Sequence, residues 1–255
     1  MPAPILTIAR FTVVEARRNR LAWLAVLAAL AGLGLAAFLG ELALTESRAT
    51  QAVLAGAFYR FAAVFLLAVF VTTSLMREFH DKVHELVLAL PVTRTAYCLG
   101  KLAGFGAVAL AFAALFALPL LLFAAPGQVA LWGASLGVEL LIVAGLGLLC
   151  AFTFGNAAAS LGAVFAFYLL ARAIAALQLL AHGGGLHASA YQKLMAGFFD
   201  ALALFLPRLD LYARGEWLAY GGGSLSELWP LVGQGAIYVA LLGAAALFDF
   251  HRKNL

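Results

Sequence analysis

Residues 77–101 read REFHDKVHELVLALPVTRTAYCLGK, a charge-bearing run with a long apolar segment on each side. Five of its first nine residues are formally charged, and two more are histidines. The chain as a whole is strongly apolar: 65% of its 255 residues are hydrophobic, 11% are charged and the mean hydropathy is +1.02. Soluble domains carry about 25% charged residues, so this composition indicates a polytopic membrane protein.

The apolar segments are long enough for helical crossings. A helix needs about 20 apolar residues to cross the hydrocarbon core, and no segment shows the strict alternation of a barrel strand. Six segments meet this length: residues 21–39, 58–76, 97–124, 129–153, 157–181 and 230–249. The sequence therefore predicts an all-α polytopic membrane protein, with six transmembrane helices in a single transmembrane domain over residues 1–255.

The basic residues predict the orientation. Six crossings place both termini on one side, and cytoplasmic loops carry the excess of Lys and Arg. Ten basic residues fall on the side of the termini: Arg10, Arg17, Arg18, Arg20, Arg77, Lys82, Arg94, Lys101, Arg252 and Lys253. The other side receives Arg48, Arg60, Lys193, Arg208 and Arg214. We therefore expect a multi-pass protein of the cell (inner) membrane, with both termini cytoplasmic and residues 182–229 as an external loop.

The opening stretch has the pattern of a short amphipathic helix. Its apolar side chains recur at helical spacing, and Pro91 ends the helix because proline lacks an N–H group. The apolar stripe comprises Phe79, Val83, Leu86, Val87 and Leu90. Thr93 can then cap the next helix. His80 and His84 are four residues apart, but no further ligand lies nearby, so we predict an exposed polar face and no metal site.

Residues 1–20 form a second amphipathic segment. At helical spacing the segment carries Ile5, Ile8, Phe11 or Thr12, and Glu15, and a basic cluster follows. This pattern suits an N-terminal elbow helix that lies in the cytoplasmic membrane interface before the first span.

The arrangement resembles the permease subunits of ABC-2 type exporters. The shared layout is an elbow helix, two spans, a cytoplasmic coupling region at residues 77–96, four more spans and a short basic tail. The residues that carry the resemblance are Arg77-Glu78-Phe79, the run from Glu85 to Arg94 with Leu90-Pro91, Tyr97, Gly100-Lys101 and the closing FDFHRKNL.

The resemblance implies that a coupling helix docks in a cleft of a cytoplasmic ABC ATPase subunit. The candidate contacts are Phe79, His80, Val83, His84, Leu86 and Val87, with Glu78 and Glu85 as partners for basic groups on the ATPase. It also implies a second permease copy, either identical or a close homologue. We expect membrane lipid around the protein, and no nucleic acid as a partner.

The sequence contains no GxxxxGK[ST] phosphate-binding loop. We therefore expect ATP and Mg²⁺ on the partner ATPase. We predict no catalytic residue and no cofactor bound by this chain.

Two charges fall well inside the predicted spans. Glu139 and Arg172 lie at similar depths on consecutive antiparallel helices. Buried ionisable groups are costly in a membrane unless they are paired, so we expect a Glu139–Arg172 ion pair.

Two other functions stay open. Residues 133–137 read GASLG, the form of a hydrolase nucleophile turn, so Ser135 with His182 would serve an intramembrane serine hydrolase. The same residues read better as a small-residue packing face, because they fall inside a helical span. A non-transporting membrane scaffold is the second alternative. In the external loop, residues 188–206 predict a re-entrant or interfacial helix ended by Pro207.

Overall fold

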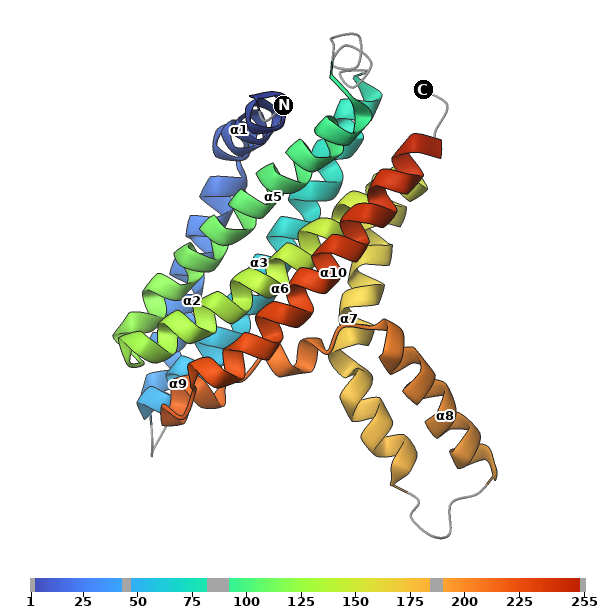
Figure 1. Ribbon diagram of the computed structural model, residues 1–255. Helices are drawn as coiled ribbons and strands as arrows, with labels where there is room; N and C mark the ends of the chain where they lie inside the picture. Colours follow the sequence, from blue (N-terminus) through green and yellow to red (C-terminus); the bar gives the residue numbers. More distant parts are fainter. Residues whose placement is uncertain (1–2, 43–46, 82–91, 184–189, 253–255) are drawn as a thin grey trace.

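The computed structural model describes residues 3–42, 47–81, 92–183 and 190–252, and these are almost entirely helical (Figure 1). Within these ranges, six helices are long and apolar enough to cross a membrane, which confirms the predicted all-α polytopic fold. They are α2 (Leu21–Leu42), α3 (Ser47–His80), α5 (Arg94–Ala117) with its 3-10 extension η1 (Leu118–Leu122), α6 (Pro126–Phe154), α7 (Ala157–His182) and α10 (Leu225–Arg252).

Helix α6 forms the centre of the bundle. In its most apolar window 78% of the residues are buried, compared with 28% for α2 and 22% for both α7 and α10. It packs against α3, α5, α7 and α10, so these four helices share α6 as a neighbour. Any side chain in the middle of α6 is therefore able to contact several other elements.

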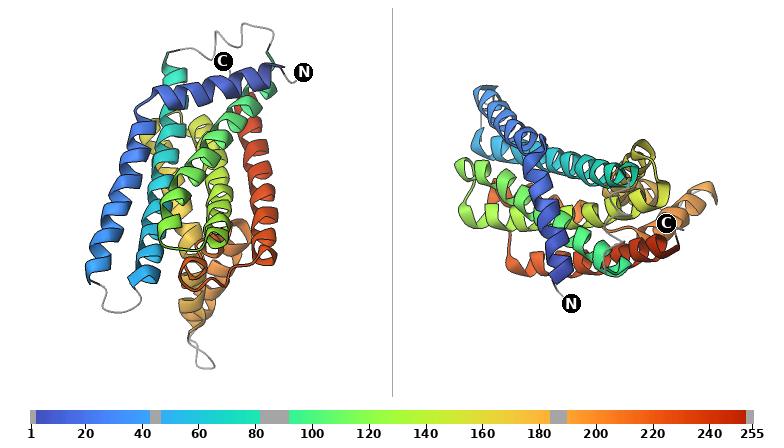
Figure 2. Two further views of the ribbon diagram at one scale, coloured as in Figure 1. Left: turned by 90° about the vertical axis from the view of Figure 1, so that its left-hand side faces the viewer. Right: turned by 90° about the horizontal axis from the view of Figure 1, so that it is seen from above.

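Helix α1 (Ala3–Arg18) is the predicted elbow helix, and it lies across one end of the bundle (Figure 2). Its inner face rests on α5, where Gly104 allows close approach: a Cβ at Gly104 would lie 2.6 Å from the Cβ of Thr12. Thr12 is buried, whereas Phe11 is 69% exposed, so Thr12 and not Phe11 faces the bundle. The chain bends at Asn19 and Arg20 into α2.

Helix α3 is longer than the sequence predicts. The predicted span of residues 58–76 begins too late, since the helix already starts at Ser47 and runs to His80. Arg60, which we placed on the external side, therefore lies inside the span. Residues 77–80 continue α3 and do not open a separate coupling helix, and residues 82–91 lie outside the described part of the chain.

Capping residues begin α5 and join α6 to α7. The Thr93 hydroxyl accepts a hydrogen bond from the Ala96 N–H at 3.2 Å, which confirms the predicted cap of α5. Gly155 has a φ of +61° and ends α6, and the Asn156 side chain then caps α7. This short link keeps α6 and α7 antiparallel.

Both ends of the described chain lie at the same end of the bundle as the last turns of α3 and the first turns of α5 (Figure 1). We call this the terminal end, and the other the opposite end. Near the opposite end, α8 (Ala190–Phe205) packs against α7 as a hairpin. The chain then returns to the bundle through the 3-10 turn η3 (Leu209–Tyr212) and the short helix α9 (Glu216–Tyr220), which contacts α3 and α6.

Candidate functional site

A cluster of charged side chains joins three spanning helices. The Arg60 Nη1 atom of α3 forms an ion pair with Glu139 Oε2 of α6, and both side chains are buried, with exposed fractions of 2% and 0%. The Arg172 Nη1 atom of α7 lies 3.4 Å from Glu139 Oε1, and its side chain is 34% exposed. One carboxylate therefore faces two guanidinium groups. We call Arg60, Glu139 and Arg172 the charge cluster.

Neutral polar groups complete the contacts of the charge cluster. The Tyr168 hydroxyl donates to Glu139 Oε1 at 2.9 Å, and Arg60 Nη2 donates to Ser135 Oγ at 3.0 Å. The Arg60 guanidinium also lies 5.0 Å from the ring centroid of Trp132. A buried ion pair is tolerated only when additional hydrogen bonds satisfy its remaining groups, and these contacts do so.

The charge cluster lies deep in the bundle. Arg60 and Glu139 are each 13 residues from the opposite-end starts of their helices at Ser47 and Pro126, and at 1.5 Å per residue this is about 20 Å along the helix. Ionisable groups at this depth are expensive in a bilayer and usually serve a function.

The structure brings Glu139 and Arg172 together, as their similar depths suggested, but Arg60 is the closer partner of the carboxylate. Our sequence reasoning missed Arg60 because we took the charge as the edge of a span. A signal was present, since residues 52–58 read AVLAGAF and extend the apolar run outward past Arg60.

The connector between α8 and α10 closes the charge cluster toward the opposite end. Ser135 Oγ lies 2.8 Å from the Trp132 carbonyl and 3.1 Å from the Tyr212 carbonyl of η3. The Tyr212 hydroxyl donates to the Leu231 carbonyl of α10 at 2.7 Å. Burial, and then the charge of Glu139, raise the pKa of the Tyr212 phenol, so this group stays a neutral hydrogen-bond donor.

The arrangement does not support Ser135 and His182 as a catalytic pair. Ser135 is fully buried in the continuous helix α6 and contacts Arg60, whereas a nucleophile elbow needs a strand-to-helix turn. His182 ends α7, where its ring contacts the Gln178 carbonyl and Asp200. Gly133 and Gly137 instead face side chains of α5, which agrees with a packing face.

A second polar group lies at the terminal end, on α3 and α5. Glu78 forms an ion pair with Lys101 and accepts a hydrogen bond from the Tyr97 hydroxyl at 2.6 Å. The side chain of Lys101 is only 5% exposed. Glu78 therefore ties the last turn of α3 to the first turns of α5.

Aromatic rings continue this contact to α6 and α10. Phe79 meets Phe152 edge to face at 5.8 Å between ring centroids, and Phe152 stacks on Phe250 at 4.8 Å. Phe250 in turn stacks on Tyr97 at 5.5 Å. We call Glu78, Phe79, Tyr97, Lys101, Phe152 and Phe250 the terminal cluster. It joins α3, α5, α6 and α10 at one level.

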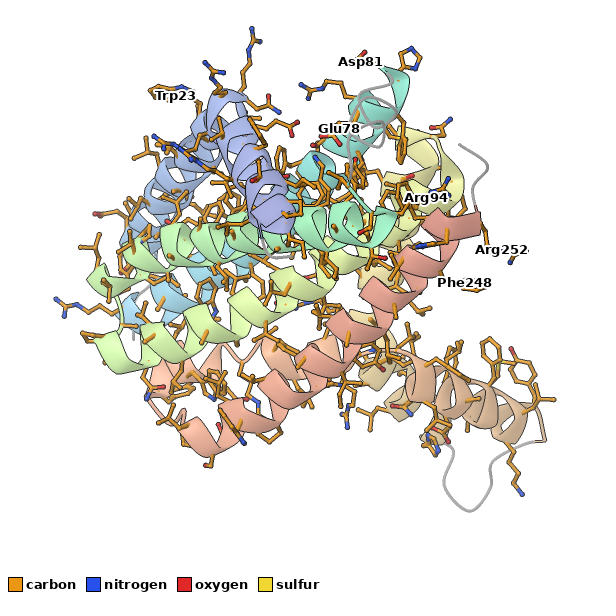
Figure 3. The ribbon with its side chains drawn as sticks, turned by 45° about the horizontal axis from the view of Figure 1, so that its top comes forward. Trp23, Glu78, Asp81, Arg94, Phe248 and Arg252 are labelled. Carbon is orange, nitrogen blue, oxygen red and sulfur yellow. The ribbon has the colours of Figure 1, made fainter. Side chains whose placement is uncertain are left out.

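Arg94 adds a link between α5 and the end of α10, because its Nη1 atom lies 3.3 Å from the His251 carbonyl and 3.5 Å from that of Phe250. Glu78 and Arg94 lie at the same end of the molecule (Figure 3). Six of the residues that carried the family resemblance are thus brought into one group of contacts: Glu78, Phe79, Arg94, Tyr97, Lys101 and Phe250.

The predicted ATPase contacts fall into three sets. Glu78 and Phe79 are partly buried, and their described contacts are within this chain, in the terminal cluster. His80 is exposed at the end of α3. The remaining candidates lie outside the described residues: Val83, His84, Glu85, Leu86 and Val87.

The chain was compared with known families and with curated proteins. The model of a family described as "ABC-2 family transporter protein" matches residues 14–182. The matched range includes all three members of the charge cluster and the α3 and α5 parts of the terminal cluster, whereas α8, η3, α9 and α10 follow it. A comparison with curated proteins gives no match.

Proposed function

The chain belongs to the ABC-2 transporter family, and on this premise we propose that it is the permease subunit of an ABC exporter, driven by a separate ATPase subunit. A six-span chain of this family forms half of a transport pathway, so the proposal includes a second copy or a close homologue.

One observation carries the proposal: α3 connects the terminal cluster to the charge cluster. Glu78 and Arg60 lie on this single helix, 18 residues or about 27 Å apart. Because a helix is stiff over this length, movement of its terminal end is transmitted to the Arg60–Glu139 pair. That pair in turn joins α6, and α6 contacts α5, α7 and α10.

The charge cluster suits a role in alternating access. Ion-pair networks between packed helices can hold one of two discrete arrangements. Here the network joins α3, α6 and α7, and the backbone of η3 closes it toward the opposite end. A shift of α3 would change the Arg60–Glu139 contact and so loosen this closure.

The orientation in the proposal follows the positive-inside rule. Arg60 lies inside the bundle, so it does not count toward the opposite end. Four described basic residues remain at that end: Arg48, Lys193, Arg208 and Arg214. The terminal end keeps the larger number, so we assign it to the cytoplasm. The terminal cluster then lies where a cytoplasmic ATPase would bind.

Co-purification tests the proposal. The intact protein would be purified in mild detergent, and chains that accompany it would be identified by mass spectrometry, for wild type, Val83→Asp and Leu86→Asp. We expect a chain with a nucleotide-binding loop in the wild-type sample and its loss in both variants. Lys193→Asp, a matched acidic substitution at the opposite end, should retain it.

Two results would contradict the proposal. If folded wild-type protein brings down no ATPase subunit, the non-transporting scaffold becomes the better account. If an ATPase subunit co-purifies equally with all variants, residues 82–91 are not the coupling region. The thermal unfolding temperature of each variant separates these results from simple misfolding.

A further inference from the structure

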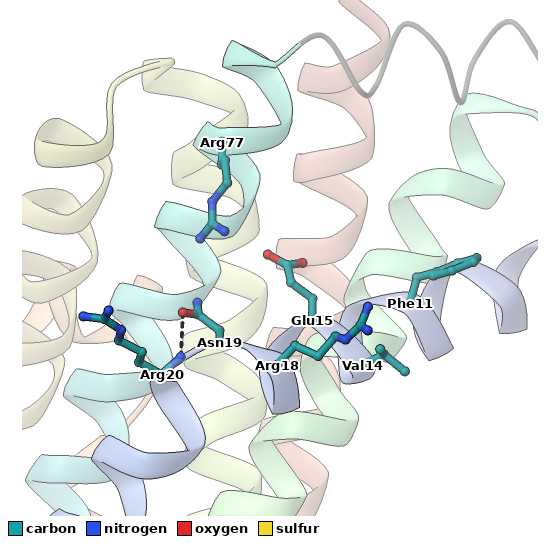
Figure 4. Close-up of a pocket in the computed structure, with 7 residues that line it drawn as sticks. All are labelled: Phe11, Val14, Glu15, Arg18, Asn19, Arg20 and Arg77. Carbon is teal, nitrogen blue, oxygen red and sulfur yellow. Dashed lines mark hydrogen bonds between the residues drawn. The ribbon is translucent and has the colours of Figure 1, made fainter.

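The elbow between α1 and α2 holds a pocket of about 550 Å³ at the terminal end (Figure 4). Arg18 and Arg20 line it from the turn between these helices, and Arg77 reaches toward it from the last turns of α3. Glu15 also lines the pocket, and its carboxylate accepts a hydrogen bond from the Ser74 hydroxyl at 2.9 Å. The pocket therefore carries three positive charges and one negative charge.

The three arginines are available to a ligand. Each is exposed, and none of them forms an ion pair with another residue in the described ranges. Arginine groups recognise phosphate through several parallel N–H donors, so this grouping is suited to a phosphate ester. Arg94 and Lys101, by comparison, contact groups of this chain.

An apolar groove continues from the pocket down α2. Arg20 lines both, and below it the groove is formed by Trp23, Leu24, Val26, Leu27 and Leu30. The side chains of Trp23 and Leu27 are 77% and 65% exposed, so no other described element covers them. The two features together match a molecule with an anionic head and a long apolar tail.

We propose that the elbow pocket binds the phosphate headgroup of an anionic phospholipid, with an acyl chain along the groove of α2. Basic pockets beside spanning helices on the cytoplasmic side bind such headgroups, and each Lys or Arg near the surface contributes to the attraction. The lipid would join α1, α2 and α3 by bridging Arg18, Arg20 and Arg77, and so hold the elbow helix against the end of α3.

Native mass spectrometry of the intact protein in nonionic detergent tests the proposal. Dioleoyl phosphatidylglycerol and dioleoyl phosphatidylcholine would be titrated separately, and bound lipid counted per protein. The test variant carries Arg18→Gln, Arg20→Gln and Arg77→Gln. The control carries Arg10→Gln, Arg17→Gln and Arg252→Gln, which removes the same charge from exposed positions at the same end.

We expect wild type and control to bind phosphatidylglycerol at least about tenfold more tightly than the test variant does. Phosphatidylcholine should bind weakly to all three. Equal binding by the test variant and wild type, equal loss in the control, or equal binding of the two lipids would each overturn the proposal. If the triple variant does not fold, Arg77→Gln against Arg17→Gln gives the same comparison.

Two competitors separate a lipid from other phosphate ligands. Inorganic phosphate and glycerophosphoglycerol, which lacks acyl chains, should displace the lipid only at far higher concentration. Displacement by either compound at the concentration of the lipid would show that the α2 groove contributes nothing, which overturns the lipid assignment.

If instead the test variant keeps its lipid but loses a co-purifying ATPase, the pocket belongs to a protein interface. Lipid binding in detergent does not depend on the exporter proposal, so the two can fail separately.

Discussion

The Arg60 guanidinium of α3 and the Glu139 carboxylate of α6 form an ion pair whose side chains are 2% and 0% exposed. Arg172 approaches the same carboxylate from α7 but is 34% exposed and 3.4 Å away. The two arginines are therefore unequal partners. The protein encloses the Arg60 side chain almost completely, whereas part of the Arg172 side chain reaches the surface of the bundle.

This inequality gives a stability prediction. Removing one member of a buried ion pair leaves an uncompensated charge and costs about 3–5 kcal/mol, whereas a partly exposed pair contributes about 1 kcal/mol or less. Arg60→Gln should therefore lower the thermal unfolding temperature in detergent much more than Arg172→Gln. An equal loss in the two variants would show that the charge cluster is not organised around Arg60.

A double-mutant cycle tests whether Arg60 and Glu139 act as a pair. We expect Arg60→Gln with Glu139→Gln to be less harmful than the sum of the two single changes, by about 1–3 kcal/mol. The double variant buries neither of these two charges without its partner, and Arg172, which then loses Glu139, is partly exposed. The free energies of unfolding of all four proteins give the coupling. Additive losses would contradict a direct interaction.

Close packing of the elbow helix gives a second kind of prediction. A Cβ at Gly104 would lie 2.6 Å from the Thr12 Cβ, so Gly104→Ala must displace α1 from α5. Overpacking of this kind costs about 1–3 kcal/mol. Gly162→Ala on α7 is the matched control, since no atom lies within 4 Å of its Cβ. Limited proteolysis should cut α1 faster in Gly104→Ala alone, and equal rates would contradict the packing.

Phe79 and His80 should behave differently although they are neighbours. Phe79 packs on Phe152, so Phe79→Ala should lower the unfolding temperature of the permease itself. His80 is exposed at the end of α3, so His80→Ala should leave that temperature unchanged. Thermal unfolding of the purified chain checks both. A stable Phe79→Ala variant would show that the terminal cluster does not hold the helices together.

Much of the fold could be predicted from the sequence, because long apolar runs require membrane crossings and capping residues such as Thr93 act locally. The partner of Arg60 could not, since the charge inside this span is tolerated only through a residue that lies 79 positions away. The Glu139–Arg172 contact could be anticipated from depth alone, whereas the preference for Arg60 depends on which helix faces meet.

The contacts of Glu78 could likewise not be predicted from the local sequence pattern. The family resemblance implied that Glu78 is a partner for basic groups on an ATPase. In the structure its carboxylate turns inward to Tyr97 and Lys101 of α5. This internal contact depends on the packing of α3 on α5, which no local pattern gives, and an ATPase contact of Glu78 stays a prediction.

Topology can be measured directly. In a background with Cys98→Ala and Cys150→Ala, single cysteines would be placed at exposed Gly222 and His251. A membrane-impermeant maleimide added to intact cells should label Gly222→Cys and leave His251→Cys unlabelled until the cells are opened. The reverse labelling would place the terminal end outside the cell and remove the proposed ATPase interface.

The most direct test of the central claim is the ATP hydrolysis rate of the purified assembly in lipid nanodiscs. It would be compared for wild type, Arg60→Gln and the permease freed of accompanying chains. We predict hydrolysis by the wild-type assembly, an altered rate in Arg60→Gln with its ATPase still bound, and none by the permease alone. Hydrolysis that is identical in wild type and Arg60→Gln would contradict coupling through α3, and hydrolysis by the isolated permease would contradict a separate ATPase.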